Sequence, residues 1–264
     1  MAVKEWKSLL MPYEQAVEEL KTKFKSIRKE YRRKNQYSPI EFVTGRVKEI
    51  SSILEKANKF EMPIDRIEYE MEDIAGIRVM CQFVDDIEWV VDIIRRRKDM
   101  QIIYEKDYIT NVKTSGYRSY HIIIKYTLYM ASGEKEILAE IQIRTLAMNF
   151  WATVEHSLNY KYKHAIPECV KEKLKAAADA AFQLDREMME IKEEIKDAQR
   201  LFEVKSDLIS DIMDNVTELG FLGKHTEVAR YRGKLSILLE EGDVIQLTEL
   251  LNNTKKAIQV YKLK

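Results

Sequence analysis

Alternating polar side chains in two neighbouring segments are the first candidates for chemistry in this sequence. From 136 to 144 apolar and polar residues alternate, so Glu140, Gln142 and Arg144 fall on one face of a predicted strand. The segment from 120 to 128 alternates in the same way, and pairing the two as a hairpin adds two polar side chains to that face, His121 and Lys125. A solvent-exposed face of an antiparallel sheet would show the same pattern, so both interpretations stand at this point.

A second carboxylate favours the functional interpretation. Asp73 stands just ahead of another predicted strand, 77–83. If that strand lies near the one that carries Glu140, the two carboxylates could hold one Mg²⁺ through oxygen atoms and leave its other positions to phosphates and water. The pair therefore indicates metal-assisted chemistry on phosphate groups.

Basic residues spaced by one helical turn form a candidate anion site. Lys48, Ser52 and Lys56 follow one another at intervals of four residues, and Arg46 precedes them. If a helix begins near Lys48, these side chains and the free amides of the first turn face one locus that suits a phosphate. An exposed basic stripe has the same spacing, so the spacing alone does not establish the site.

The charge of the chain is balanced overall but not locally. Among 264 residues, 44 are basic and 44 acidic, which excludes a uniformly cationic protein. Residues 1–60 nevertheless carry 14 Lys and Arg against 8 Asp and Glu, and the run 21–34 holds eight basic residues and one acid. That run is interpreted either as the solvated face of a helix or as a surface that faces a nucleotide, RNA or an acidic partner.

Several common motifs do not occur in the sequence. The segment GFLGKHT at 220–226 has two residues between its glycines instead of four and His after its Lys, so it is not a P-loop. The four histidines include no His-Asp pair on which a phosphohydrolase metal site could be built. Two cysteines and the lack of an apolar stretch of ~18 residues predict a cytoplasmic protein without a membrane span.

The first 60 residues are predicted to be helical. Only 8 Gly and 4 Pro occur in the whole chain, and the apolar residues of 9–33 recur at the helical period. Ser38-Pro39-Ile40-Glu41 matches a capping box and predicts a helix start. We expect Gly45 to break that helix, with a second one beginning near Lys48.

Between about 70 and 145 the apolar period changes to two, which predicts a small sheet. Strands are expected at 77–83, 100–108, 120–128 and 136–144, with a helix at 85–97 and a hairpin turn at Ser132-Gly133. After Arg144 the pattern is helical again. It predicts a long charged helix over 170–201 and two or three short helices over 202–264.

Four blocks of the sequence resemble the synthetase motifs of the Rel/SpoT alarmone enzymes, and most closely the small RelQ-type synthetases. The blocks are SPIEFVTGRVK at 38–48, EDIAGIR at 72–78, SGYRSYH at 115–121 and EIQIRTLAMNFWATVEH at 140–156. They occur in the order and spacing of the family, and the resemblance covers about residues 5–200. It implies an α+β, nucleotidyltransferase-like mixed sheet flanked by helices. It also implies transfer of the β,γ-pyrophosphate of ATP to the ribose 3′-hydroxyl of GDP or GTP.

The resemblance assigns roles to residues that match the motifs. Glu140 matches the catalytic glutamate, which takes the 3′-hydroxyl proton and helps to hold Mg²⁺, and Asp73 matches the principal Mg²⁺ ligand. The ATP side is matched by Arg46, Lys48, Ser52, Lys56 and Arg78, with Arg46 and Arg78 enclosing adenine. The guanine nucleotide is matched by a stacking tyrosine, Tyr117, and by His121, Lys125, Gln142 and Asn149.

The same resemblance implies an organisation and a regulation. We expect a synthetase domain over 1–204, made of a helical arm (1–37), a core (38–165) and a long helix (168–200), and a helical extension of unassigned role over 205–264. Members of this type form tetramers with a central cleft for pppGpp. The residues here that match the cleft are Lys21, Lys25, Phe42, Thr44 and Gly45. Because the hydrolase domain of the long enzymes is missing, we expect synthesis without degradation.

Two other functions remain open. One is an oligomeric regulator whose basic 21–34 helix binds single-stranded RNA, with binding that depends steeply on salt. The other is a toxin-like relative that pyrophosphorylates adenine nucleotides or the 3′ end of tRNA. The guanine-side residues Tyr117 and Asn149 argue against the second.

Overall fold

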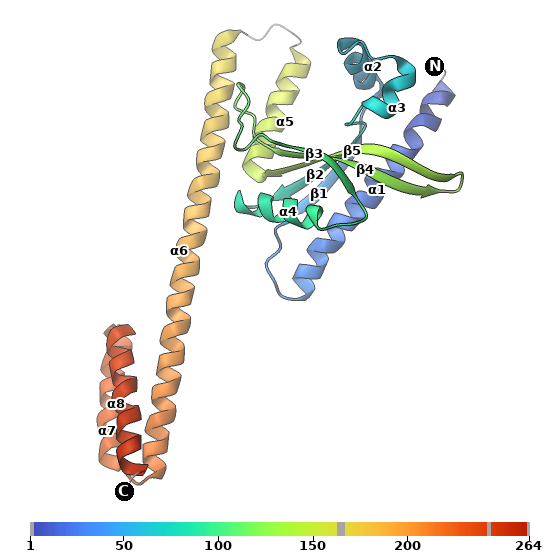
Figure 1. Cartoon of the computed structure of the whole chain (residues 1–264). Helices are drawn as coiled ribbons and strands as arrows, with labels where there is room; N and C mark the ends of the chain where they lie inside the picture. The colour runs from blue at the N-terminus through green and yellow to red at the C-terminus, as the bar shows by residue number, and fades with distance from the viewer. Residues whose placement is uncertain (1–2, 163–166, 242–243, 263–264) are drawn as a thin grey trace. The chain divides into compact units, whose positions relative to one another are not determined.

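The computed structural model describes every residue except 1–2, 163–166, 242–243 and 263–264 (Figure 1). The chain divides into two compact units, residues 1–189 and 190–264. This division lies inside one long helix and precedes the expected boundary at 204, which stays a prediction. Each unit has a core of its own, and each is described separately below.

The first unit is built on a five-stranded mixed sheet, which confirms the predicted α+β class. The strands are β1 (Phe42–Val47), β2 (Ala75–Cys81), β3 (Gln101–Asp107), β4 (Tyr120–Met130) and β5 (Gly133–Thr145). Their order across the sheet is β1-β2-β5-β4-β3. Strands β2 and β5 are parallel and every other pair is antiparallel. The hairpin between β4 and β5 is confirmed, with Met130 opposite Gly133.

The other regular elements of the described residues are helices. In the first unit they are α1 (Val3–Arg33), α2 (Ile50–Lys59), the 3₁₀ turn η1 (Ile64–Arg66), α3 (Ile67–Glu70), α4 (Asp85–Arg95) and α5 (Leu146–Lys161). Helix α6 (Glu168–Phe221) follows, and it extends 20 residues beyond its predicted end. The chain closes with α7 (His225–Glu241) and α8 (Val244–Lys262).

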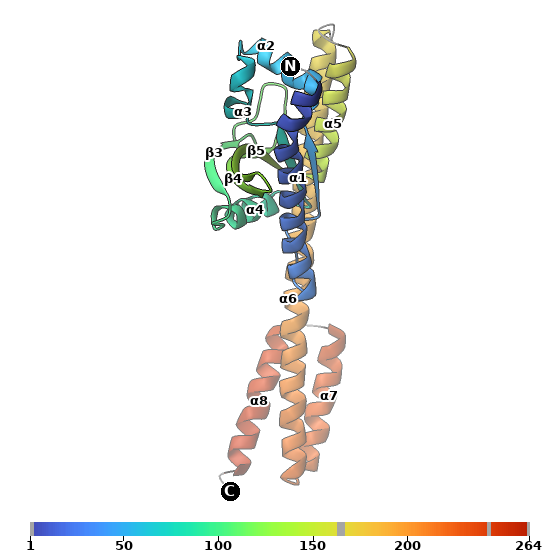
Figure 2. The ribbon, with the colours of Figure 1, turned by 90° about the vertical axis from the view of Figure 1, so that its right-hand side faces the viewer.

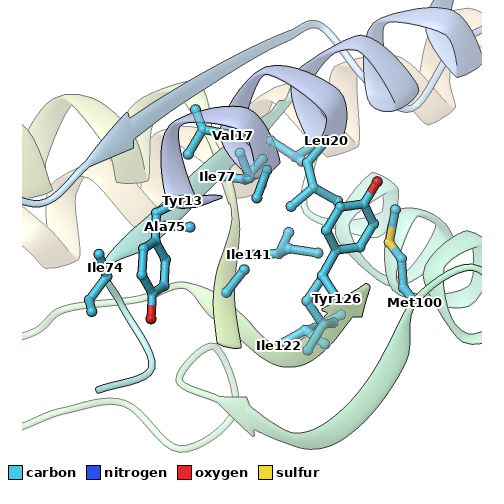
Figure 3. Packing of buried hydrophobic residues seen from close by; sticks show 14 of the residues in the cluster. Tyr13, Val17, Leu20, Ile74, Ala75, Ile77, Met100, Ile122, Tyr126 and Ile141 are labelled. Atoms are coloured by element: carbon cyan, nitrogen blue, oxygen red, sulfur yellow. The ribbon is translucent and has the colours of Figure 1, made fainter. Parts of the chain in front are cut away.

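One apolar core lies between the sheet and the helices packed on it, with α1 and α4 among them. The β-branched side chains of Ile77 and Ile141 are fully buried in β2 and β5, where their pleated spacing directs them to one face. Figure 3 shows Val17 and Leu20 of α1 packed over that face. Helix α4 adds Val90 to the same core. The other face of the sheet is thereby left to the polar residues that alternate with these.

The prediction of a helix that starts at Ser38 is wrong, because residues 42–47 form strand β1. This segment pairs antiparallel with β2, and its own Val43 is buried in the core. Ser38 does cap locally, since its Oγ accepts from the Ile40 amide at 3.2 Å, but only a turn follows. Pairing with a neighbouring strand outweighs a local capping signal.

Gly45 has a packing role rather than the predicted helix-breaking role. It lies inside β1, where a Cβ atom would stand 2.7 Å from Val17 Cγ1 of α1. A side chain at this position would therefore push the strand away from the helix. The second helix does exist, and α2 begins at Ile50, two residues after Lys48.

The second unit is a small helical bundle. Figure 2 shows α7 and α8 on either side of the last part of α6. Its core is formed by Ile212 and Val216 of α6, Leu235 of α7, and Leu250 and other apolar residues of α8. Among the described residues, no helix is both long enough and apolar enough to cross a lipid bilayer.

A buried carboxylic acid joins α6 to the start of α5 in the first unit. Asp185 is only 5% exposed, and its Oδ2 accepts a hydrogen bond from Thr145 Oγ1 at 2.6 Å. The same hydroxyl oxygen accepts from the Met148 amide at 3.1 Å and so caps α5. Burial raises the pKa of Asp185 to about 6.

Replacing Asp185 with asparagine is expected to raise the free energy of unfolding at pH 8 by about 2–3 kcal/mol and to change it little at pH 4. Because the pKa is raised in the folded state, folding favours the protonated acid, and this contribution is lost as the pH rises from the ordinary value of 3.8 to about 6. The amide stays neutral and can still accept the Thr145 hydrogen bond. Urea unfolding can be followed by the fluorescence of the three tryptophans, which all lie in the first unit: Trp6, Trp89 and Trp151.

The control for this measurement is Glu172→Gln, which changes an exposed carboxylate of the same helix within the first unit. It should show no pH-dependent difference from the unchanged chain. If Asp185→Asn differed from the unchanged chain by the same amount at every pH, the raised pKa would be disproved.

Candidate active site

The register of the sheet lines up the polar residues that were singled out from the sequence. Arg78 of β2 lies opposite Gln142 of β5, and Gln142 lies opposite His121 of β4. One row further along, Glu140 lies opposite Gly76, which has no side chain. Three neighbouring strands therefore present one polar face, and over Gly76 the nearest atoms belong to Arg46 of β1, whose Cγ would lie 3.9 Å from an added Cβ.

Glu140 is held by hydrogen bonds from both sides. Its Oε1 lies 2.8 Å from His121 Nδ1, and its Oε2 accepts from Gln142 Nε2 at 2.7 Å. Burial alone would raise the pKa of Glu140, but the hydrogen bond and charge of His121, followed by the Gln142 hydrogen bond, hold it below its usual value. At neutral pH this carboxylate is ionised and can accept a proton.

Asp73 lies between two lysines at the entrance of β2. Its Oδ2 is 2.8 Å from Lys48 Nζ and its Oδ1 is 2.8 Å from Lys56 Nζ. Burial opposes ionisation, yet the hydrogen bonds and charges of the two lysines lower the pKa of Asp73. The negative charge of Asp73 also acts on Glu140, so the two carboxylates belong to one electrostatic site.

A cavity of about 800 Å³ opens beside these groups between the sheet, α2 and α5. Its volume suits a nucleotide-sized ligand. The structure brings all the residues predicted for the donor side to its wall, namely Arg46, Lys48, Ser52, Lys56 and Arg78, together with Asp73. Helix α5 supplies His156 on the opposite side.

Three guanidinium groups crowd this cavity. Burial and then the charges of Arg144 and Arg46 lower the pKa of Arg78. Arg144 is 2% exposed, and burial lowers its pKa as well. Like charges held this close together are stabilised by an anion, so the cavity favours a polyphosphate.

Tyr117, which was predicted to bind the acceptor nucleotide, is linked to Glu140 through His121. Its hydroxyl lies 2.8 Å from His121 Nε2 and accepts from Arg144 Nη2 at 2.9 Å. His121 therefore bridges Tyr117 and Glu140, one ring nitrogen to each. The Tyr117 ring meets the His121 ring edge to face with 5.8 Å between centroids.

Three residues in this region were not predicted to have roles. Lys113 Nζ lies 4.3 Å from the Tyr108 ring centroid and 4.8 Å from that of Tyr117. Burial lowers the pKa of Lys113. Arg144 lines the cavity and donates to the Tyr117 hydroxyl. The strand period had already placed Arg144 on the polar face, and Tyr108 stands at the end of the predicted strand 100–108. Lys113 belongs to the irregular segment after β3, where no period applies.

Two predicted acceptor residues stand apart from this network. Lys125 Nζ forms an ion pair with Glu136 Oε2 at 2.5 Å, further along the β4–β5 hairpin. Asn149 lies in α5, and its buried Oδ1 has no hydrogen-bond partner among the residues that the structure describes. A buried acceptor without a donor is costly, so a ligand that donates a hydrogen bond would be favoured there.

The residues predicted for an effector site lie on α1 and β1, outside the wall of the cavity. Lys21 contacts the strand, since a Cβ on Gly45 would stand 2.9 Å from its Cδ, and its Nζ pairs with Glu18 at 2.7 Å. The other members of the set are exposed side chains, namely Lys25, Phe42 and Thr44.

Known proteins match both the sequence and the fold. The profile of the region found in RelA and SpoT proteins matches residues 45–165. The GTP pyrophosphokinase YjbM of Bacillus subtilis is 57% identical over 202 residues, which are 76% of this chain and 95% of that protein. The GTP pyrophosphokinase YwaC of the same organism is 38% identical over 73% of this chain and 93% of that protein.

Solved structures agree with these matches. The small alarmone synthetase 1 of Bacillus subtilis bound to its product pppGpp has a TM-score of 0.71 and 58% identity, over 73% of this chain and 98% of that one. A GTP pyrophosphokinase family protein from Streptococcus pneumoniae has a TM-score of 0.71 and 57% identity, over 75% and 98% of the two chains. From these matches, together with the four sequence blocks that side-chain contacts join into one site, it follows that the chain belongs to the RelA/SpoT family, among its small alarmone synthetases.

Proposed function

We propose that this chain is a GTP pyrophosphokinase, which transfers the β,γ-pyrophosphate group of ATP to the ribose 3′-hydroxyl of GDP or GTP. The products are AMP and ppGpp or pppGpp. The observation that carries the proposal is the hydrogen-bond network of Glu140. His121 joins Glu140 to Tyr117, and Gln142 joins it to Arg78 and Arg144 in the wall of the cation-lined cavity.

The donor nucleotide fits the cavity. Arg46 and Arg78 offer guanidinium planes that can stack on adenine, and this is a better match for a base than a lysine would be. Lys48 and Lys56 lie where the phosphates would lie, and each forms an ion pair with Asp73. These positive groups would offset the charge that builds on the transferred phosphates.

The acceptor nucleotide fits the other side of Glu140. The exposed part of Tyr117 can stack on guanine, and the free Oδ1 of Asn149 can accept a hydrogen bond from the N–H edge of that base. His121, Gln142 and Lys125 complete the set that we assign to the acceptor. Of these, the first two bind Glu140 directly.

The reaction then needs one proton transfer. Glu140 takes the proton of the 3′-hydroxyl, whose oxygen forms a bond to the β-phosphorus of ATP. The bond between that phosphorus and the bridging α,β oxygen breaks, and AMP leaves with the electron pair. His121 holds the Glu140 carboxylate in place through a 2.8 Å contact.

The residues present suit Mg²⁺ as a cofactor. Among the described residues there is no cluster of three or more His, Cys, Asp or Glu side chains that could hold a metal ion alone. Asp73 and Glu140 provide two carboxylates, which is typical of Mg²⁺ sites that take their remaining ligands from phosphates and water. When bound, the cation would neutralise phosphate charge and polarise the phosphoryl oxygens.

Incubation of the full chain with ATP, Mg²⁺ and each acceptor tests the function. We expect AMP together with ppGpp from GDP or pppGpp from GTP, and we expect the product to persist on longer incubation. Parallel reactions with adenine nucleotides and with tRNA distinguish the toxin-like alternative. Formation of no guanosine tetra- or pentaphosphate under any of these conditions would refute the proposal.

The assembly and its effector belong to the same proposal. A solved relative is bound to its product pppGpp, which supports an effector or product site for that nucleotide here. We place the effector site at Lys21, Lys25, Phe42, Thr44 and Gly45, in a homotetramer. Single-stranded RNA remains a second candidate ligand for the basic 21–34 segment, whose exposed lysines and arginines would contact phosphates.

A further inference from the structure

The segment that carries Tyr117 is packed against α6. Gly116 has a φ of +85°, and a Cβ atom there would stand 2.6 Å from the Ala178 Cβ of α6. Only glycine permits this approach and this backbone conformation together. The position of Tyr117 therefore depends on a helix that contributes no residue to the cavity.

Arg118, the next residue after Tyr117, joins this segment to the helix. Its Nη1 donates to the Gly116 carbonyl at 3.2 Å and to the Ala178 carbonyl at 3.4 Å. Its Nη2 lies 3.0 Å from Asp179 Oδ1, and its guanidinium carbon lies 4.3 Å from the Phe182 ring centroid. The side chain is only 12% exposed. A planar guanidinium can make these contacts at once, whereas an ammonium group cannot.

The same part of α6 also holds α5. Trp151 Nε1 donates to the Leu174 carbonyl at 2.7 Å, and Asp185 accepts from Thr145 at the start of α5. The ring centroids of Tyr117 and Trp151 are 6.4 Å apart. The segment with Tyr117 and the helix with Asn149, which we propose to bind the guanine base, are thus both held by contacts with α6.

We propose that Arg118 is a positioning residue for the acceptor nucleotide, which fixes Tyr117 by anchoring its segment to α6. The proposal rests on the acceptor role of Tyr117 proposed above. None of the polar contacts of Arg118 involves Asp73, Glu140 or a residue of the donor cavity. Its loss should therefore weaken binding of the acceptor more than binding of ATP.

Steady-state kinetics of Arg118→Ala test this, with ATP and GDP varied separately. We expect the KM for GDP to rise about 10–100-fold, the range for loss of charged hydrogen bonds, while the KM for ATP stays within about threefold. Arg118→Lys keeps the positive charge but loses the planar guanidinium with its several donors, and it should give an intermediate KM for GDP. Arg186→Ala is the matched control, because it removes an exposed arginine of α6 itself, and it should leave both KM values within about threefold.

The outcomes separate a positioning role from general damage. An unchanged KM for GDP in folded Arg118→Ala would overturn the proposal, and so would equal rises in both KM values. If Arg118→Ala does not fold, the same comparison is made with Arg118→Lys, for which a rise confined to GDP supports the proposal and an unchanged or equal rise overturns it. Absence of pyrophosphate transfer by the unchanged chain would instead refute the proposed function.

Discussion

Replacing Glu140 with glutamine is expected to lower the kcat of pyrophosphate transfer by about 10²–10⁴-fold, the usual contribution of a general base. Glutamine keeps the size of the side chain but cannot take the 3′-hydroxyl proton. The fold should persist, because Glu140 sits on a polar face above a core made by Ile141 and its neighbours. Product formation by the purified variant, followed as AMP released from ATP, measures the effect.

The matched control is Glu136→Gln, which changes a glutamate on the same side of β5 that pairs with Lys125 rather than with His121. It should retain kcat within about threefold. The pH profile gives a second check. Because the pKa of Glu140 is lowered, its ionised form persists at neutral pH, and the rate should fall only as the pH drops through that lowered pKa. Full activity of Glu140→Gln would remove this residue from the mechanism.

Replacing Asp73 with asparagine should lower kcat by about 10²-fold or more and raise the Mg²⁺ concentration needed for half-maximal rate. The amide is a weaker ligand for a hard cation, and it removes the negative charge that Lys48 and Lys56 share. The two lysines are then free to meet ATP phosphates, so the KM for ATP should rise far less than kcat falls.

A Mg²⁺ titration of the rate, at saturating ATP and GDP, measures this second effect. Asp65→Asn is the control, since it changes an exposed carboxylate in η1, away from the cavity wall. A variant at Asp73 with the Mg²⁺ requirement and kcat of the unchanged chain would show that the metal ligands lie elsewhere.

The sheet and most of the candidate site could be predicted from the sequence because β5 alternates strictly. Its buried isoleucines define one face, so the remaining side chains, with Glu140 and Gln142 among them, had to share the other. Asp73 was singled out by its place just ahead of a predicted strand, and the resemblance to the family then identified Tyr117; both lie outside the regular strands.

Other features could not be predicted because tertiary contacts decide them. Strand β1 begins four residues after Ser38, whose capping signal is local, while the pairing that makes it a strand comes from β2. Lys113 lies in the irregular segment between β3 and β4, where no strand period applies. Its contact with the Tyr117 ring could therefore not be predicted. The bond from Arg118 to the Ala178 carbonyl joins residues 60 positions apart, and no sequence pattern records it.

The mixed pairing of β5 has a consequence for the order of folding. On one side β5 meets β4 through a short hairpin, which can form within microseconds. On the other side it meets β2 in parallel, through residues 64 positions apart, and such non-local pairing is slow. The hairpin brings His121 and Glu140 together early, but Asp73 joins them only when β2 docks. A nascent or partly unfolded chain is therefore expected to have no synthetase activity, so that alarmone synthesis begins only when β2 has paired with β5.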